Sequence, residues 1–296
     1  MACGPLYWKH PAAVELAISP ETKGYARPEL LVTTDWLAAH LDDPNVRLVD
    51  MGMPDGYLRA HIPGAVHPGP ERSHWLKDPA DPLHVMKADT FRDLVEGWGI
   101  GDGTLVVAYD EDGGHQAARL WSVMRHYGHD TVRILDGGWN TWLADGRPAT
   151  QAVPKHKRAS FTPKPRGDVF VQVEEMKALV GKPAAQLLDV RSQGEWEGTV
   201  TRGNRRTGHI PGAAHMEWLD AVTGDGIKAF RSAEEVKKRL GSVGVTGEKP
   251  VVTYCQGGVR ASHTAFVLTL LGYKDVRIYD GSFAEWGNRD DTPIVK

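Results

Sequence analysis

The strongest constraint on this chain is that its second half repeats its first. His61-Ile62-Pro63-Gly64-Ala65 recurs 148 positions later as His209-Ile210-Pro211-Gly212-Ala213. The stretch Val132–Gly137 recurs 144 positions later as Val276–Gly281. Ordered matches at a nearly constant offset indicate a tandem duplication, so we expect two copies of one fold. The length of 296 residues suits two domains of ordinary size.

The boundaries of the two copies can be placed from composition. Prolines and basic residues without apolar periodicity fill 148–166, which predicts an extended linker. We therefore expect an N-terminal tail at 1–27, a first domain at 28–147 and a second domain at 167–296. The role of the tail stays open.

Strands and helices are predicted to alternate within each copy. Short apolar runs at 104–109 and 250–254 are typical of buried strands. The stretch 232–240 predicts a helix capped by its serine, and 261–271 predicts a helix that ends at Gly272. This alternation favours an α/β fold, with a mainly parallel sheet flanked by helices in each copy. Ligands of such sheets bind beyond the carboxyl ends of the strands.

Composition and charge exclude several classes of protein. The net charge of −3 argues against nucleic acid as a partner. No apolar run approaches the roughly 20 residues of a membrane span, and the N-terminus lacks a signal-peptide pattern, so we expect no membrane partner and a cytoplasmic location. Cys3 lies in the tail and Cys255 lies more than 250 positions later, so we expect no disulfide between them. No CxxC pair indicates a metal site.

The loop after the strand at 250–254 carries the candidate chemistry. Cys255 is followed by Gln256-Gly257-Gly258-Val259-Arg260 and then by the predicted helix. A thiol at a helix N-terminus meets unpaired N–H groups that favour an anion. The paired glycines allow backbone amides to line a concave anion site. The first copy has Asp110 in place of Cys255, and a carboxylate cannot replace a thiol as the nucleophile, so we expect one catalytic and one supporting copy.

These features together resemble the tandem-domain rhodanese family, which includes thiosulfate sulfurtransferase and 3-mercaptopyruvate sulfurtransferase. The resemblance spans about residues 30–293. It rests on Asp189-Val190-Arg191-Ser192, the paired His-Ile-Pro-Gly motifs, the Cys255 loop, and Asp280-Gly281-Ser282 with Glu285-Trp286-Gly287. It implies two similar α/β domains, an inactive first one and a catalytic second one. It also implies a ping-pong cycle with no metal or organic cofactor.

The resemblance also implies roles for individual residues. Cys255 would take sulfur from a small anionic donor, hold it as a persulfide and pass it to cyanide or a thiol, including a protein thiol. Arg191 would face the pocket and bind the donor anion. Arg260 departs from the threonine common in the tandem family, and both an inward role at the anion and an outward role as a loop anchor stay open. The expected substrate-binding positions are Arg191, Gln256, Gly257, Gly258, Val259 and Arg260.

The choice of donor is less constrained than the reaction. The residues after Cys255 match neither the cationic pattern of thiosulfate enzymes nor the Gly-Ser-Gly of mercaptopyruvate enzymes. Thiosulfate is favoured because Arg191 and Arg260 would supply positive charge. Mercaptopyruvate as donor, and a persulfide relay between proteins, stay open. A cysteine phosphatase is disfavoured because its loop is Cys-x5-Arg, whereas Cys255 to Arg260 is Cys-x4-Arg.

One insertion distinguishes the second copy. The segment between Asp189 and His209 is nine residues longer than the segment between Asp50 and His61. It contains Arg202, Arg205 and Arg206, which predict either a basic rim beside the active site or a solvated loop.

Overall fold

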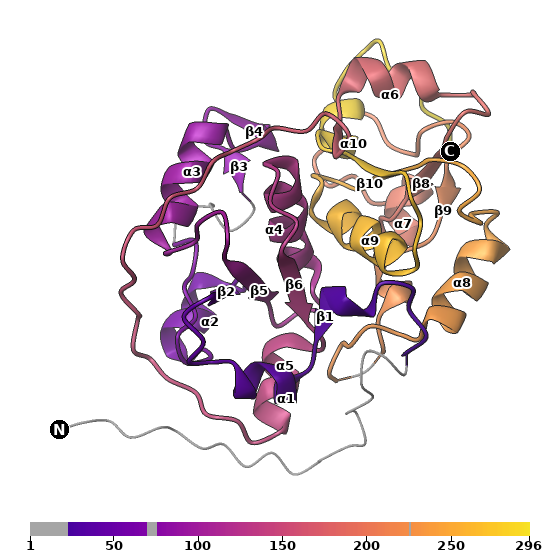
Figure 1. Cartoon of the computed structure of the whole chain (residues 1–296). Coiled ribbons are helices and arrows are strands. Elements are labelled where there is room, and N and C mark those ends of the chain that lie inside the picture. The colour runs from indigo at the N-terminus through magenta and orange to yellow at the C-terminus, as the bar shows by residue number, and fades with distance from the viewer. Residues whose placement is uncertain (1–22, 70–75, 225) are drawn as a thin grey trace.

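The first half is built on a four-stranded parallel sheet. In the computed structural model, which describes residues 23–69, 76–224 and 226–296, its strand order is β1-β6-β5-β2 (Figure 1). Neighbouring strands run parallel. A separate antiparallel pair, β3 with β4, follows in the same half. The strands are β1 Leu31–Val32, β2 Val46–Asp50, β3 Lys77–Asp78, β4 Asp81–Val85, β5 Leu105–Tyr109 and β6 Val132–Leu135.

The second half repeats this design in a five-stranded sheet. Its order is β7-β11-β10-β8-β9, again with parallel neighbours. The prediction of an α/β fold with two mainly parallel sheets is therefore confirmed. The strands are β7 Phe170–Val171, β8 Gln186–Asp189, β9 Ala214–His215, β10 Val251–Tyr254 and β11 Val276–Tyr279.

Helices flank both sheets (Figure 1). Within the described residues, no helix is long and apolar enough to cross a membrane. The α-helices are α1 Thr34–Ala39, α2 Pro54–Arg59, α3 Ala88–Gly97, α4 His115–His126, α5 Gly138–Ala144, α6 Val173–Leu179, α7 Gln193–Trp196, α8 Ala233–Ser242, α9 Val259–Leu270 and α10 Ser282–Trp286.

Local sequence signals explain where two of these helices begin and end. α8 starts after Ser232, whose hydroxyl accepts a hydrogen bond from the Glu235 amide while the Glu235 carboxylate accepts one from the Ser232 amide. This reciprocal pair is a capping box. α9 ends just before Gly272, whose φ of +89° suits the left-handed position that follows a helix.

The two halves share one core where α4 packs on α9. The rings of Trp121 and Phe266 meet edge to face across this contact, with centroids 5.1 Å apart. α9 is buried along almost its whole length because its own sheet covers one side and α4 covers the other. The carboxyl end of β10, which leads directly into α9, therefore lies at the contact between the halves.

Two further segments hold the halves together. The linker crosses the outer side of the first half in an extended form (Figure 1). It is attached there, because the Ala159 amide donates to the Glu96 carbonyl at 3.1 Å and Phe161 is buried. At the end of the N-terminal tail, Lys23 contacts Asp136 of the first half and donates to the Phe230 carbonyl of the second at 2.8 Å. Residues 1–22, which include Cys3, lie outside the described residues.

Candidate active site

Cys255 lies at the carboxyl end of β10 and is buried. Its thiol sulfur accepts a hydrogen bond from the Gly258 amide at 3.1 Å. Its own amide donates to the Ser282 hydroxyl at 3.2 Å, and its carbonyl accepts from the Phe283 amide at 2.9 Å. The start of α10 thus fixes the backbone of Cys255, while the loop directs an N–H group at its sulfur.

Gly258 is required by both conformation and space. Its φ of +86° lies in the left-handed region, and α9 starts at the next residue. A Cβ added at Gly258 would lie 2.9 Å from a carboxylate oxygen of Asp280 and 3.0 Å from the Asp280 carbonyl oxygen. Gly257 has no positive φ, and a Cβ added there would have no neighbour within 4 Å. The loop therefore packs directly against Asp280 through Gly258.

Gln256 is fixed by the insertion that distinguishes the second half. Its side-chain amide exchanges two hydrogen bonds with the side-chain amide of Asn204, each 3.0 Å long. The Gln256 carbonyl accepts from the Ala284 amide at 2.8 Å. The Cys255 loop is consequently held from both sides, by the insertion and by α10.

A cavity of about 390 Å³ opens over Cys255 and is formed by both halves. Five of the positions predicted from the sequence line this cavity: Cys255, Gln256, Gly257, Val259 and Arg260. Gly258 contributes its amide to the sulfur from beneath. The cavity is completed by Lys77, Pro82, Leu83 and His115 from the first half, and by Arg202 and Ala284 from the second.

Arg260 combines the two roles that the sequence left open. It lines the cavity, and its two terminal nitrogens donate to the two carboxylate oxygens of Glu195 at 2.8 and 2.9 Å. Burial alone would raise the pKa of Glu195, but the hydrogen bonds and charge of Arg260 outweigh burial and lower that pKa to about 2. Arg260 therefore presents a fixed positive charge to the cavity while it anchors α9 to α7.

Arg191 is not brought to the cavity, contrary to the expectation that it faces the pocket. Its guanidinium is buried and forms an ion pair with Asp189, two residues earlier. It also donates to the Gly208 carbonyl at 2.7 Å and lies 3.9 Å from the centroid of the Phe283 ring. Because its donors are used inside the domain, the structure gives Arg191 a role in joining β8 to the insertion.

The insertion supplies one arginine to the rim and keeps two away from it. Arg202 lines the cavity with a side chain that is 57% exposed, and its Nε lies 3.7 Å from Glu195. Arg205 pairs with Asp290, and Arg206 donates to backbone carbonyls near the C-terminus. The alternatives of basic rim and solvated loop thus apply to different residues of one segment.

The equivalent loop of the first half contains a fixed carboxylate. Asp110 is buried at the end of β5, and backbone amides donate to both of its oxygens. The donors are the amides of Asp112, Gly114, Gln116 and Ala117, at 2.8 to 2.9 Å. The duplicated loop therefore forms an anion cradle in the first half, with its own side chain as the anion.

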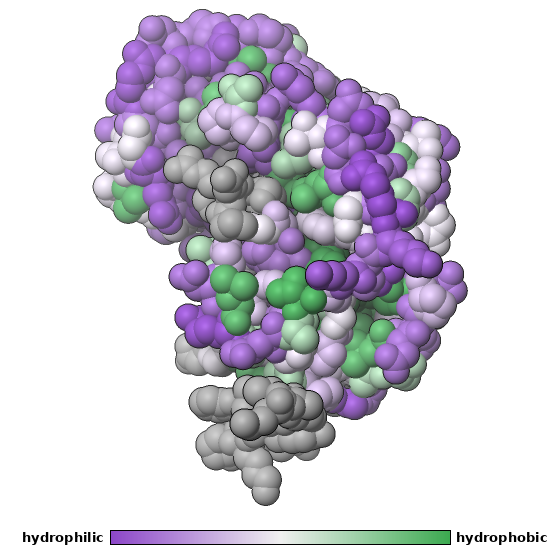
Figure 2. Space-filling view, turned by 90° about the vertical axis from the view of Figure 1, so that its left-hand side faces the viewer, coloured by the Kyte–Doolittle hydropathy of each residue, from purple (hydrophilic) through white to green (hydrophobic). Residues whose placement is uncertain are grey.

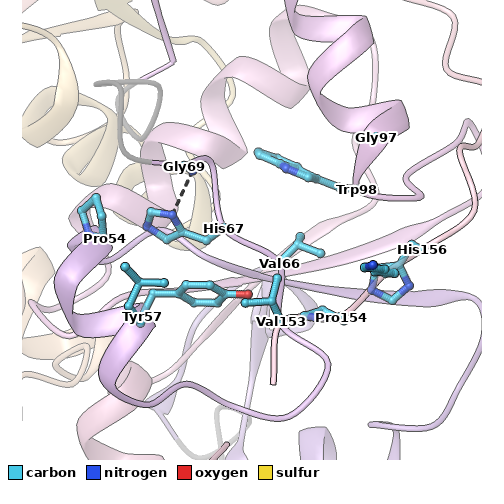
Figure 3. Close-up of a pocket in the computed structure, with 12 residues that line it drawn as sticks. Pro54, Tyr57, Val66, His67, Gly69, Gly97, Trp98, Val153, Pro154 and His156 are labelled. Carbon is cyan, nitrogen blue, oxygen red and sulfur yellow. Dashed lines mark hydrogen bonds between the residues drawn. The ribbon is translucent and has the colours of Figure 1, made fainter. Parts of the chain in front are cut away.

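A larger cavity, of about 710 Å³, lies in the first half between α2, the end of α3 and the linker. The rings of Tyr57, His67 and Trp98 and the linker residues Val153 and His156 surround it (Figure 3). On this side of the molecule, hydrophobic residues are exposed among mostly hydrophilic ones (Figure 2). It contains no cysteine, so we assign the site to the smaller cavity that holds Cys255.

No cluster of three or more metal-binding side chains occurs among the residues that the structure describes. His61 and His209, the repeated histidines, pack on the rings of Tyr57 and Trp196 and do not line the Cys255 cavity.

This fold and site agree with the family to which the sequence belongs. The family model for the rhodanese-like domain matches residues 33–145 and 172–289. The chain therefore belongs to the rhodanese-like family, as the resemblance predicted, and contains two copies of its domain.

Curated relatives resemble the chain over almost its whole length. The sulfur carrier protein TtuD of Thermus thermophilus is 38% identical over 92% of this chain and 99% of its own. The thiosulfate sulfurtransferase of Corynebacterium glutamicum is 38% identical over 93% of each chain. Among solved structures, a persulfide form of EanB with ergothioneine has a TM-score of 0.82 and 25% identity, over 91% of this chain and 71% of that one. These names support a sulfurtransferase.

Proposed function

We propose that this sulfurtransferase moves a sulfane sulfur from thiosulfate to cyanide or a thiol through a persulfide on Cys255. The Cys255 thiolate attacks the outer sulfur of thiosulfate. A new S–S bond forms while the S–S bond of the donor breaks, and sulfite leaves with the electron pair. Cyanide then attacks the outer sulfur of the persulfide, forms thiocyanate and returns the thiolate. Two easier displacements replace one difficult transfer.

The observation that carries this proposal is the surroundings of the Cys255 sulfur. The Gly258 amide points at the sulfur from the loop, and Arg260 lines the cavity above it. Both groups favour negative charge, which the thiolate and the persulfide carry throughout the cycle. The carboxylate of Asp110, bound by amides in the duplicated loop, supports the same use of this loop geometry.

We assign binding of the donor anion to Arg202 rather than Arg191. Arg260 directs both terminal nitrogens at Glu195, and Lys77 donates to Asp280 and to the Leu83 carbonyl. Among the described residues, Arg202 makes one ionic contact, in which its Nε lies 3.7 Å from a carboxylate oxygen of Glu195. Its guanidinium can therefore turn toward the sulfonate oxygens of thiosulfate and donate two parallel hydrogen bonds.

Two other donors would use the same site. The carboxylate of 3-mercaptopyruvate could bind Arg202 in the same way as a sulfonate. A protein persulfide is supported by the name of the Thermus relative, a sulfur carrier protein. We take thiosulfate first because of the positive charge that lines the cavity and the name of the Corynebacterium relative.

The division of labour between the halves is part of this proposal. Residues 167–296 would form the catalytic domain, and residues 28–147 a supporting domain that has lost the nucleophile. The linker at 148–166 would connect them, and Lys23 would brace them. We also propose a cytoplasmic location, where a reducing environment keeps Cys255 available as a thiol.

Steady-state kinetics test the reaction and the donor site together. With thiosulfate and cyanide, a persulfide cycle gives parallel lines in a double-reciprocal plot. Arg202→Gln should raise KM for thiosulfate by about tenfold with little change in kcat, since a charged hydrogen bond to bound substrate is lost. Arg205→Gln is the matched control, because it removes the same charge from a side chain of nearly equal exposure that does not line the cavity.

Three other results would each contradict a different part of the proposal. Equal KM values for the two arginine variants would contradict the role of Arg202. Turnover of 3-mercaptopyruvate but not of thiosulfate would change the donor. Sulfur uptake from a protein persulfide alone would favour the relay.

A further inference from the structure

Lys77 extends from the non-catalytic half into the cavity over Cys255. It is the first residue of β3, in the hairpin that lies beside α10 of the second half (Figure 1). Its side chain is only 9% exposed. Its ammonium donates to the Leu83 carbonyl at 2.6 Å and to the Asp280 carboxylate at 2.9 Å. The hydrogen bonds fix the charge in place beside the catalytic loop.

Asp280 alone does not explain why a second cation is buried here. Its carboxylate already accepts hydrogen bonds from Arg119 at 2.8 Å and from the Val85 amide at 2.6 Å. Burying an ammonium is unfavourable unless nearby negative charge compensates. Burial lowers the pKa of Lys77 to about 8, while the charges of Asp280 and of Cys255 act in the opposite direction. Asp280 and, when it is ionised, the sulfur of Cys255 are thus the groups whose negative charge favours the charged form of Lys77.

We propose that Lys77 is a positioning residue, supplied by the non-catalytic half, whose charge stabilises the anionic sulfur of Cys255. It acts through space, since its protons are directed at Asp280 and Leu83 rather than at the sulfur. The effect on the thiolate does not depend on the proposed function. The expectation that the same charge stabilises the persulfide does rest on it. It also explains why the half without a nucleophile forms one wall of the cavity.

Lys77 acts among other charges, which the test must hold constant. Asp280 lies directly against Gly258 of the loop and is bound by Lys77. A charge from each half therefore lies beside the loop. Among the described residues, the other charged or titratable groups near the sulfur and Lys77 include Asp81 of β4, Arg260 of α9, Glu195 of α7, His115 and Arg119 of α4, Arg202 of the insertion and Asp280 after β11.

The pH dependence of alkylation of Cys255 by neutral iodoacetamide measures this effect without any sulfur donor. Lys77→Met should raise the pH midpoint of alkylation by about one unit, which corresponds to a tenfold smaller thiolate fraction below both midpoints. Lys77→Arg should keep the midpoint near that of the unmodified protein. Lys87→Met is the control, because Lys87 belongs to the neighbouring segment, is exposed, and pairs with Asp78 outside the cavity.

Lys77→Gln resolves the case in which Lys77→Met does not fold. Glutamine can still donate hydrogen bonds but carries no charge, so its midpoint should also rise. Midpoints that are unchanged in Lys77→Gln or folded Lys77→Met, even with lower melting temperatures, would overturn the inference and leave Lys77 a structural role. A raised midpoint together with no sulfur uptake by any form of the protein would retain the inference and reject the proposed function instead.

Discussion

Gly258 shows how one backbone position controls the site at the scale of single residues. It adopts a left-handed conformation, donates its amide to the Cys255 sulfur and leaves no room for a Cβ beside Asp280. Gly257, directly before it, has an ordinary φ and open space at its Cβ position. The two adjacent glycines therefore provide a matched pair of substitutions.

Gly258→Ala should lower the free energy of unfolding by about 2 kcal/mol or more, because strain in the left-handed region adds to the contact with Asp280. Gly257→Ala should change it by less than about 1 kcal/mol. Urea denaturation of both variants measures the difference. Equal stabilities would show that the loop relaxes without cost and that Gly258 is not required for its shape.

Residue identity in the loop was predictable, whereas the direction of one arginine was not. Cys255, Gln256, Gly257, Val259 and Arg260 reach the cavity as their position in a strand–loop–helix unit implies. Arg191 follows a strand in the same way but turns inward. A carboxylate two residues earlier is the signal that could have indicated this, although sequence alone does not say whether such a pair closes.

At the scale of secondary-structure elements, the pair of Glu195 and Arg260 joins α7 to α9. Glu195 also accepts hydrogen bonds from Ser192 in a capping box at the start of α7. One carboxylate thus caps a short helix and fixes the charge that lines the cavity. The pKa of Glu195, lowered to about 2, makes this junction sensitive to acid.

The sign of this dependence follows from linkage. A carboxyl group with a lowered pKa stabilises the fold above its ordinary pKa near 4.5, and this contribution is lost as pH falls toward 2. Glu195→Gln should therefore cost about 2 kcal/mol at pH 7, and the difference from the unmodified protein should shrink between pH 4.5 and pH 2. Urea denaturation across this range measures it. A difference independent of pH would contradict the ion-pair account.

Elements were predictable where local signals agree. The serine cap predicted a helix at 232–240, and composition with Gly272 predicted one at 261–271; the structure has these helices at Ala233–Ser242 and Val259–Leu270. The insertion was ambiguous because arginines suit either a rim or solvent. In the structure Arg202 lies at the cavity and Arg205 lies away from it. This arrangement depends on the hydrogen bonds between Asn204 and Gln256, two residues that are far apart in the sequence.

At the scale of the whole molecule, Asp280 connects the halves beside the Cys255 loop. It belongs to the second half, while Arg119, Lys77 and Val85, which donate to it, belong to the first. Burial alone would raise the pKa of Asp280, but the charges of Arg119 and Lys77 outweigh it and lower the pKa to about 2. The matching residue of the first half, Asp136, accepts a hydrogen bond from the Phe230 amide of the second half, so a contact between the halves occurs in both copies. The cations differ, because Lys77 and Arg119 pair with Asp280 whereas Lys23 pairs with Asp136, and the duplication alone does not predict them.

Asp280→Asn should reduce the free energy of unfolding by about 3 kcal/mol, because two buried cations lose their shared carboxylate. Asp290→Asn provides the control, since Asp290 is exposed and pairs with Arg205 at the surface, where such pairs contribute little. Thermal unfolding compares the two. If both variants melt alike, the halves are held by the packing of α4 on α9 rather than by this charge cluster.

The central claim is that Cys255 carries the sulfur, and intact mass spectrometry tests it most directly. After incubation with thiosulfate, the protein should gain one sulfur, about 32 Da, and lose it on addition of cyanide. Cys255→Ser should show no gain. A gain that persists in Cys255→Ser, or no gain from thiosulfate, 3-mercaptopyruvate or a protein persulfide, would contradict the account.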